Sequence, residues 1–118
     1  MITEDYVSFE IAKLLKEKEF DEYCGYYSSD GEYWGYCVYN HRGKDYISAP
    51  TLQMAMKWLR EVHNIDIIIN VSSKDESDDK RKYAYAIVSK QFIGTDNIKR
   101  TYEEACESAI KYCLEKLI

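Results

Sequence analysis

The sequence predicts an α+β domain in which a mainly antiparallel sheet packs against about three helices. Apolar residues recur at helical spacing near the start, middle and end of the chain. Between these stretches lie segments rich in tyrosine and β-branched residues, joined by short polar turns. This alternation predicts the order α-β(β)β-α-β-β-α, with a meander and a hairpin supplying the strands.

Three segments carry helix signals. Ser8 can cap "SFEIAKLLKEKEF", and Pro50 suits the first turn of "SAPTLQMAMKWLREVHN", for which Asn64 is a left-handed terminator. Thr101 followed by Glu104 is a capping box that begins "TYEEACESAIKYCLEKLI". These signals predict three amphipathic helices.

The spacing of apolar residues predicts which helix faces are buried. In the first helix we expect Lys16 on the solvated side. The inward stripe of the first helix is expected to consist of Val7, Ile11, Leu14, Leu15 and the aliphatic stem of Lys18. That of the second helix is expected to consist of Leu52, Ala55, Met56, Leu59 and Val62, with Met54 and Trp58 widening the face.

Turn signals at "SSDGE" and "NHRGK" divide the aromatic region into strands. We expect a small antiparallel meander over Tyr23–Tyr27, Tyr33–Tyr39 and Asp45–Ser48. After the second helix, "IDIIINV" alternates with isoleucine and Val71 on one face, and "YAYAIVSKQFI" returns as its partner across "SSKDESDDKRK". The helical phrases "AMKWLREV" (Ala55–Val62) and "AIKYCLEK" (Ala109–Lys116) share a residue pattern, and each closes a strand–strand–helix unit. A weak ββα duplication is one interpretation, and chance similarity of two amphipathic helices is the other.

Composition predicts one globular domain spanning residues 1–118. The chain is 46% hydrophobic and 31% charged, and its net charge of −5 disfavours nucleic acid as a partner. No apolar run approaches the roughly 20 residues of a membrane span. The N-terminal "MITEDYVSFE" has no basic region typical of a secretory signal, so we expect a cytoplasmic protein with no membrane partner.

Three phrases, "FEIAKLLKEKEF", "SAPTLQMAMKWLREVHNI" and "TYEEACESAIKYCLEKLI", together give the chain a recognisable overall pattern. In this it resembles a group of short proteins, of no assigned activity, from gut Bacteroides and their prophages. The resemblance covers nearly the whole chain and implies an origin in a mobile element. It carries no catalytic residues over to this sequence.

Candidate chemical sites are weak. Cys24, Cys37 and His41, with His63 more remote, could ligate a metal, but their spacing lacks the close ligand pairs of zinc sites. Cys37 and His41 could meet as nucleophile and base across a turn, although the sequence offers no group to orient the histidine. No glycine-rich phosphate motif occurs. We therefore expect no metal, no cofactor and no enzyme activity.

The stretch "YCGYYSSDGEYWGYCVYNHRG" is the unusual feature. On its second strand, Trp34, Tyr36 and Val38 share one face, while Tyr33, Gly35, Cys37 and Tyr39 share the other. We expect one of these two faces in the core and the other in solvent. The candidate binding surface consists of Tyr26, Tyr33, Tyr39, His41 and Arg42.

Three functions remain open on this basis. The favoured hypothesis is a small non-enzymatic interaction protein that binds a protein partner or itself through the tyrosine-rich surface. The second is a single-stranded nucleic-acid-binding module that stacks bases on the same rings. The third is a cysteine-dependent enzyme. The sequence does not identify the partner or the oligomeric state.

Overall fold

The computed structural model describes residues 2–74, 81–94 and 98–118. Among these residues are the expected three α-helices: α1 over Phe9–Glu17, α2 over Leu52–His63 and α3 over Tyr102–Tyr112. A π-helical turn, Cys113–Leu117, continues α3. None of the described helices combines the length and the apolar character needed to cross a membrane.

The strands form two antiparallel sheets. In the first, β1 (Cys24–Tyr27), β2 (Tyr33–Val38) and β3 (Ile47–Ser48) are arranged in the order β2-β1-β3. In the second, β4 (Asp66–Lys74), β5 (Arg81–Val88) and β6 (Phe92–Gly94) lie in the order β4-β5-β6. The predicted class and element order are confirmed.

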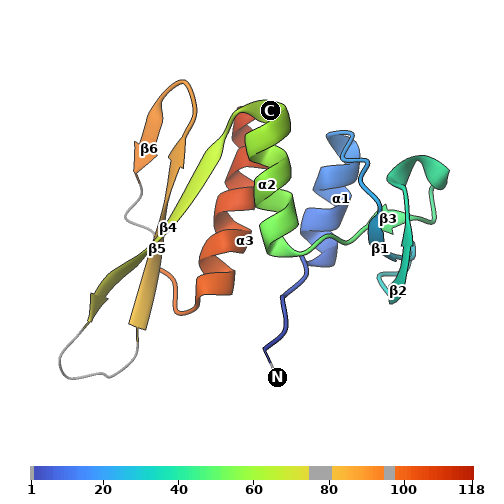
Figure 1. Cartoon of the computed structure of the whole chain (residues 1–118), viewed down its shortest axis with the longest axis horizontal. Helices are drawn as coiled ribbons and strands as arrows, with labels where there is room; N and C mark the ends of the chain where they lie inside the picture. Colours follow the sequence, from blue (N-terminus) through green and yellow to red (C-terminus); the bar gives the residue numbers. More distant parts are fainter. Residues whose placement is uncertain (1, 75–80, 95–97) are drawn as a thin grey trace.

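The helices lie between the two sheets (Figure 1). Helix α1 packs against β3 at one end of the molecule, while α3 packs against β4 and β5 at the other. The expected single sheet is therefore two sheets with the helices as a shared middle layer. The first sheet also differs from a simple meander, because β3 returns beside β1 instead of β2.

The strand orders bear on the possible duplication. Each sheet is followed by a helix, as a ββα repeat requires. The central strand, however, is the first of the three in one sheet and the second in the other. The two units therefore differ in connectivity, which favours the interpretation that their helices resemble each other by chance.

The core fills the space between the helices and both sheets. Fully buried aliphatic side chains come from the segment before α1, from the helices and the π-helical turn, and from β5: Val7, Ile11, Leu15, Leu59, Ile87, Ile110 and Leu114. Three expected inward residues are instead exposed: Val62 by 59%, Val71 by 53% and Met54 by 37%. Val62 lies in the last turn of α2, and Val71 lies in the second half of β4. Figure 1 shows that one end of β4 extends past the helices.

Local capping follows the sequence signals closely. Ser8 Oγ accepts from the Ile11 amide at 3.3 Å, and Thr101 Oγ1 accepts from the Glu104 amide at 3.1 Å. Helix α2 begins two residues later than Pro50 suggested, because Thr51 caps it. Asn64 ends that helix with the expected left-handed backbone, at φ 56°.

Candidate interaction surface on strand β2

Strand β2 is exposed on both of its faces. The side chains of Tyr33, Trp34 and Tyr36 are 39%, 42% and 61% exposed, and only Val38 at the end of the strand is buried. The expectation that one face of this strand belongs to the core is wrong. The reason is its position: β2 is an edge strand, and α1 packs against β3 on the opposite side of β1.

The face of β2 that carries Trp34 and Tyr36 forms one aromatic cluster. The Tyr26 ring lies 5.5 Å from the Tyr36 ring and 4.9 Å from the Tyr46 ring, with Trp34 6.4 Å from Tyr36. The Tyr26 hydroxyl donates to the Tyr36 hydroxyl at 2.9 Å, which raises the pKa of Tyr26 to about 12. Tyr26 is only 6% exposed, so it supports this cluster and is not itself accessible to a partner.

The opposite face of β2 is organised around Tyr33. Its ring lies 4.8 Å from Tyr6 and 5.8 Å from Tyr27, whose hydroxyl donates to the Val7 carbonyl at 2.7 Å. A β-carbon at Gly25 would lie 2.7 Å from the Tyr33 hydroxyl, so the ring can occupy this place only above a glycine. The pKa of Tyr33 is raised to about 12, mainly by partial burial and to a lesser extent by the hydrogen bond with Tyr6.

Tyr39 and His41 form a third group after the end of β2. The Tyr39 ring lies 5.2 Å from Tyr23 and stacks on the His41 imidazole at 5.4 Å. His41 Nδ1 lies 2.7 Å from Asp21 Oδ2, and its amide donates to Asp21 Oδ1 at 3.0 Å. The hydrogen bond from His41 lowers the pKa of Asp21. The sequence-predicted residues are thus divided among three clusters instead of forming one surface.

Arg42 belongs with the first of these clusters. Its guanidinium lies 5.3 Å from the centre of the Tyr46 ring, an arrangement that allows a cation–π interaction. The Tyr46 ring in turn contacts Tyr26. Arg42 therefore marks the end of the Trp34–Tyr36 face, and it is exposed.

Lys16 fixes the loop that follows β2, a role that sequence reasoning missed. Its Nζ lies 2.8 Å from the Asn40 carbonyl, 3.0 Å from the Gly43 carbonyl and 2.7 Å from the Tyr46 carbonyl. The buried Asn40 amide donates to the Phe20 carbonyl at 2.7 Å, and its Oδ1 accepts from both Lys16 and the Ser48 amide. Burial lowers the pKa of Lys16. The expectation that Lys16 points into solvent is wrong.

The structure does not bring together the residues of the two alternative sites, the cysteine–histidine pair and the metal site. His41 is hydrogen-bonded to Asp21 instead of Cys37, which is exposed, while Cys24 is buried. Across the described ranges, no group of three histidine, cysteine or acidic side chains is placed to hold a metal. The sequence could not reveal Asp21 as the partner of His41, because the two lie 20 residues apart.

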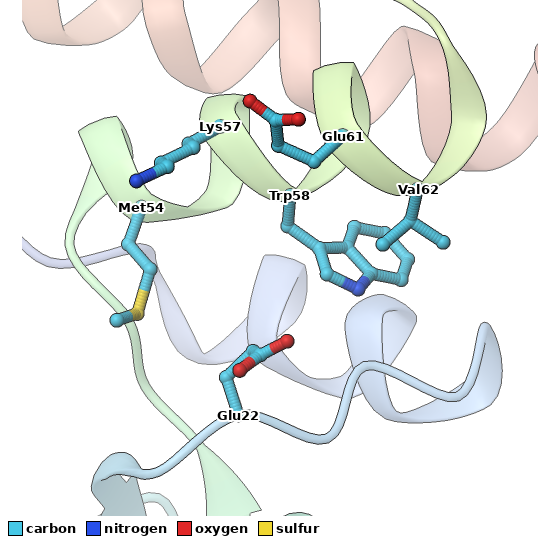
Figure 2. Close-up of a pocket in the computed structure, with 6 residues that line it drawn as sticks. All are labelled: Glu22, Met54, Lys57, Trp58, Glu61 and Val62. Atoms are coloured by element: carbon cyan, nitrogen blue, oxygen red, sulfur yellow. The ribbon is translucent and has the colours of Figure 1, made fainter.

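A shallow pocket of about 200 Å³ lies along α2. Figure 2 shows Met54, Trp58 and Val62 pointing from the helix toward the segment that carries Glu22. The Trp58 indole is 7% exposed and packs edge-on against Phe20 and His63. This pocket is apolar, small and rimmed by charges of both signs.

A further exposed apolar patch lies on the second sheet. Ile87 and Ile93 face the helices, so their neighbours Ala86 and Phe92 lie on the outer face, with Ile68 beside them. Phe92 is 70% exposed and Ile68 is 43% exposed. This patch is at the opposite end of the molecule from β2 (Figure 1).

Comparison with known proteins identifies no relative. No protein-family model matches the chain, and no curated protein or solved structure is significantly similar to it. The functional argument therefore depends on the geometry of β2 and its surroundings.

Proposed function

We propose that this protein is a non-enzymatic interaction protein that binds a protein partner, or a second copy of itself, through β2. One observation carries the proposal: an edge strand displays Tyr33, Trp34 and Tyr36 to solvent and has no charged residue between Tyr33 and Val38. Tyrosine and tryptophan are the side chains that most often dominate binding energy at protein interfaces.

The edge itself supplies a second means of recognition. Among the described residues, β2 has a hydrogen-bonded neighbour only on the β1 side. An extended partner segment can add to such an edge through main-chain hydrogen bonds, while side chains on the two faces provide specificity. The exposed rings of β2 flank this edge on both faces.

The four cysteines support a reducing location. Cys24, Cys37, Cys106 and Cys113 are all free thiols. Because disulfides accumulate in oxidising compartments, these free thiols support a cytoplasmic location as part of the proposal. A mobile-element origin is part of the same proposal and is supported only by the sequence pattern described above.

A pull-down from the native host, with nuclease treatment as a control, tests the proposed function. We expect capture of a protein that the variant Tyr33→Ala/Tyr36→Ala loses and that the control Phe92→Ala, on the other sheet, retains. Unchanged capture by the double variant would contradict a role for β2. Capture that vanishes with nuclease and with rising salt would instead indicate single-stranded nucleic acid, since phosphate contacts weaken as salt increases.

A further inference from the structure

Strand β2 lacks the features that normally protect a sheet edge. Edge strands are commonly blunted by charged side chains or proline, and the stretch Tyr33–Val38 contains neither. At its centre, a β-carbon on Gly35 would meet no atom within 4 Å. One face of the sheet is therefore uncovered at the middle of the strand, which leaves room there for side chains of a neighbouring strand.

The charges that flank β2 differ between its two ends. Asp30 and Glu32 precede the strand, and Arg42 and Lys44 follow it, with Asp45 as the single acid on that side. All five side chains are exposed. An antiparallel neighbour of the same sequence would place its basic end beside the acidic end of β2, and its acidic end beside the basic end of β2. A parallel neighbour would set like charges together.

We infer that the partner of β2 is a second copy of this chain, which adds antiparallel to β2 and joins the two first sheets into one of six strands. This inference rests on the proposed function and names its partner. A two-fold axis at Gly35 places Trp34 opposite the partner's Tyr36, and Tyr33 opposite the partner's Cys37. The pairing of Trp34 with Tyr36 is a cross-strand aromatic pair, which is a favourable arrangement on an antiparallel sheet.

The mass of the protein in solution, measured by analytical ultracentrifugation over a concentration series, is the first test. We expect a dimer that Tyr36→Lys converts to a monomer, because a charged edge residue opposes strand addition. The control Phe92→Lys changes a residue of similar exposure on the second sheet and should remain dimeric. A monomeric natural protein, or a dimer that only Phe92→Lys dissociates, would overturn the inference.

Charge exchange tests the antiparallel orientation. Glu32→Arg and Arg42→Glu should each weaken the dimer about two- to tenfold, because each variant sets like charges at the same end of the paired strands, at exposed positions where charge interactions are weak. The double variant Glu32→Arg/Arg42→Glu should recover the original dissociation constant. Failure of the double variant to recover while both single variants weaken the dimer would exclude the proposed pairing of opposite ends.

Cysteine cross-linking tests the register without requiring loss of folding. In a Cys37→Ser background the three remaining cysteines are buried. Gly35→Cys should then give a disulfide-linked dimer on mild oxidation, whereas Val62→Cys, exposed on α2, should not. Absence of cross-linking at positions 34, 35 and 36 alike would refute β2 pairing.

These results separate the inference from the proposed function. If the protein is monomeric and Tyr36→Lys still abolishes capture of a host protein, β2 binds a different chain and the inference is wrong. If Tyr36→Lys changes neither self-association nor capture, both proposals are wrong.

Discussion

Ser8 and Glu107, which lie 99 residues apart in the sequence, join the first helix to the last. The Ser8 amide donates to Glu107 Oε1 at 2.8 Å, and the Ser8 hydroxyl donates to Oε2 at 3.2 Å. The same hydroxyl accepts from the Ile11 amide within α1. Glu107 of α3 thus completes the N-terminal cap of α1, where a negative charge also interacts favourably with the helix dipole.

Glu107→Ala should lower the free energy of unfolding by about 1 kcal/mol, because the Ser8 amide loses its acceptor at a partly hydrated site. Chemical denaturation measures this change. Glu103→Ala, an exposed position of the same helix, is the matched control and should have a smaller effect. Equal losses would show that the bonds to Ser8 add nothing.

The stability of the protein should also depend on pH through Glu107. Burial raises the pKa of this carboxyl above its ordinary value of 4.5. Burial outweighs the hydrogen bonds from Ser8, so the folded state holds the proton more tightly than the unfolded state. Ionisation above the folded-state pKa therefore removes part of the stability that the protonated carboxyl provides. Compared with Glu107→Gln, the natural protein should gain stability as pH falls toward 4.5. Thermal melts of both proteins between neutral pH and pH 4.5 measure this. Melting temperatures whose difference stays constant across that range would contradict the prediction.

Lys16→Met should destabilise the protein by about 1–3 kcal/mol, because three main-chain carbonyls in the loop after β2 lose a charged donor. Methionine preserves the aliphatic volume, so the loss reports mainly on hydrogen bonding. Lys57→Met, at an exposed position on α2, should change the unfolding free energy little. Similar denaturation midpoints for the two variants would contradict the role assigned to Lys16.

The hydrogen bond between Asp21 and His41 should contribute to the free energy of unfolding in a way that depends on pH. That bond lowers the carboxyl pKa below the ordinary value of 3.8, so the stabilisation is complete above 3.8 and is lost as pH falls through the folded-state pKa. Asp21→Asn should therefore differ from the natural protein at neutral pH and approach it in acid. Differential scanning calorimetry at several pH values measures the difference, and a constant gap would be inconsistent with this account.

The four thiols should react in two classes. Cys37 is exposed, whereas burial raises the pKa of Cys24, of Cys106 to about 11 and of Cys113 to about 12. Because the thiolate is the reactive form, a neutral alkylating reagent at pH 7.5 should label one cysteine rapidly and the others only after unfolding. Mass spectrometry counts the labels. Rapid labelling of two or more cysteines in the folded protein would contradict the prediction, because it would mean that a buried thiol is accessible to the reagent.

Local signals in the sequence predicted the elements well. Ser8, Thr101 and Asn64 act at the helix ends where their side-chain or backbone preferences placed them. These preferences operate within a few residues, so the sequence displays them directly. Element order followed for the same reason.

Long-range arrangement was less accessible from the sequence. Alternation along β2 separates two faces, but nothing in that pattern says whether a helix covers either one, and α1 instead packs against β3. Lys16 was assigned to solvent because lysine usually lies there, yet its acceptors come from a loop 24 to 30 residues away. Hydrogen bonds to main-chain carbonyls leave no mark on side-chain composition.

The hydrogen bonds from Lys16 to the loop after β2 have a consequence for dimer formation. Binding normally incurs an entropic cost for ordering the segments that form the interface. The Asn40–Tyr46 loop bears Arg42, and its ends are already tied to α1 in the free protein. If β2 pairs as proposed, Lys16→Met should weaken the dimer even though residue 16 lies outside the dimer interface. Isothermal titration calorimetry should then show a less favourable entropy of association for the variant.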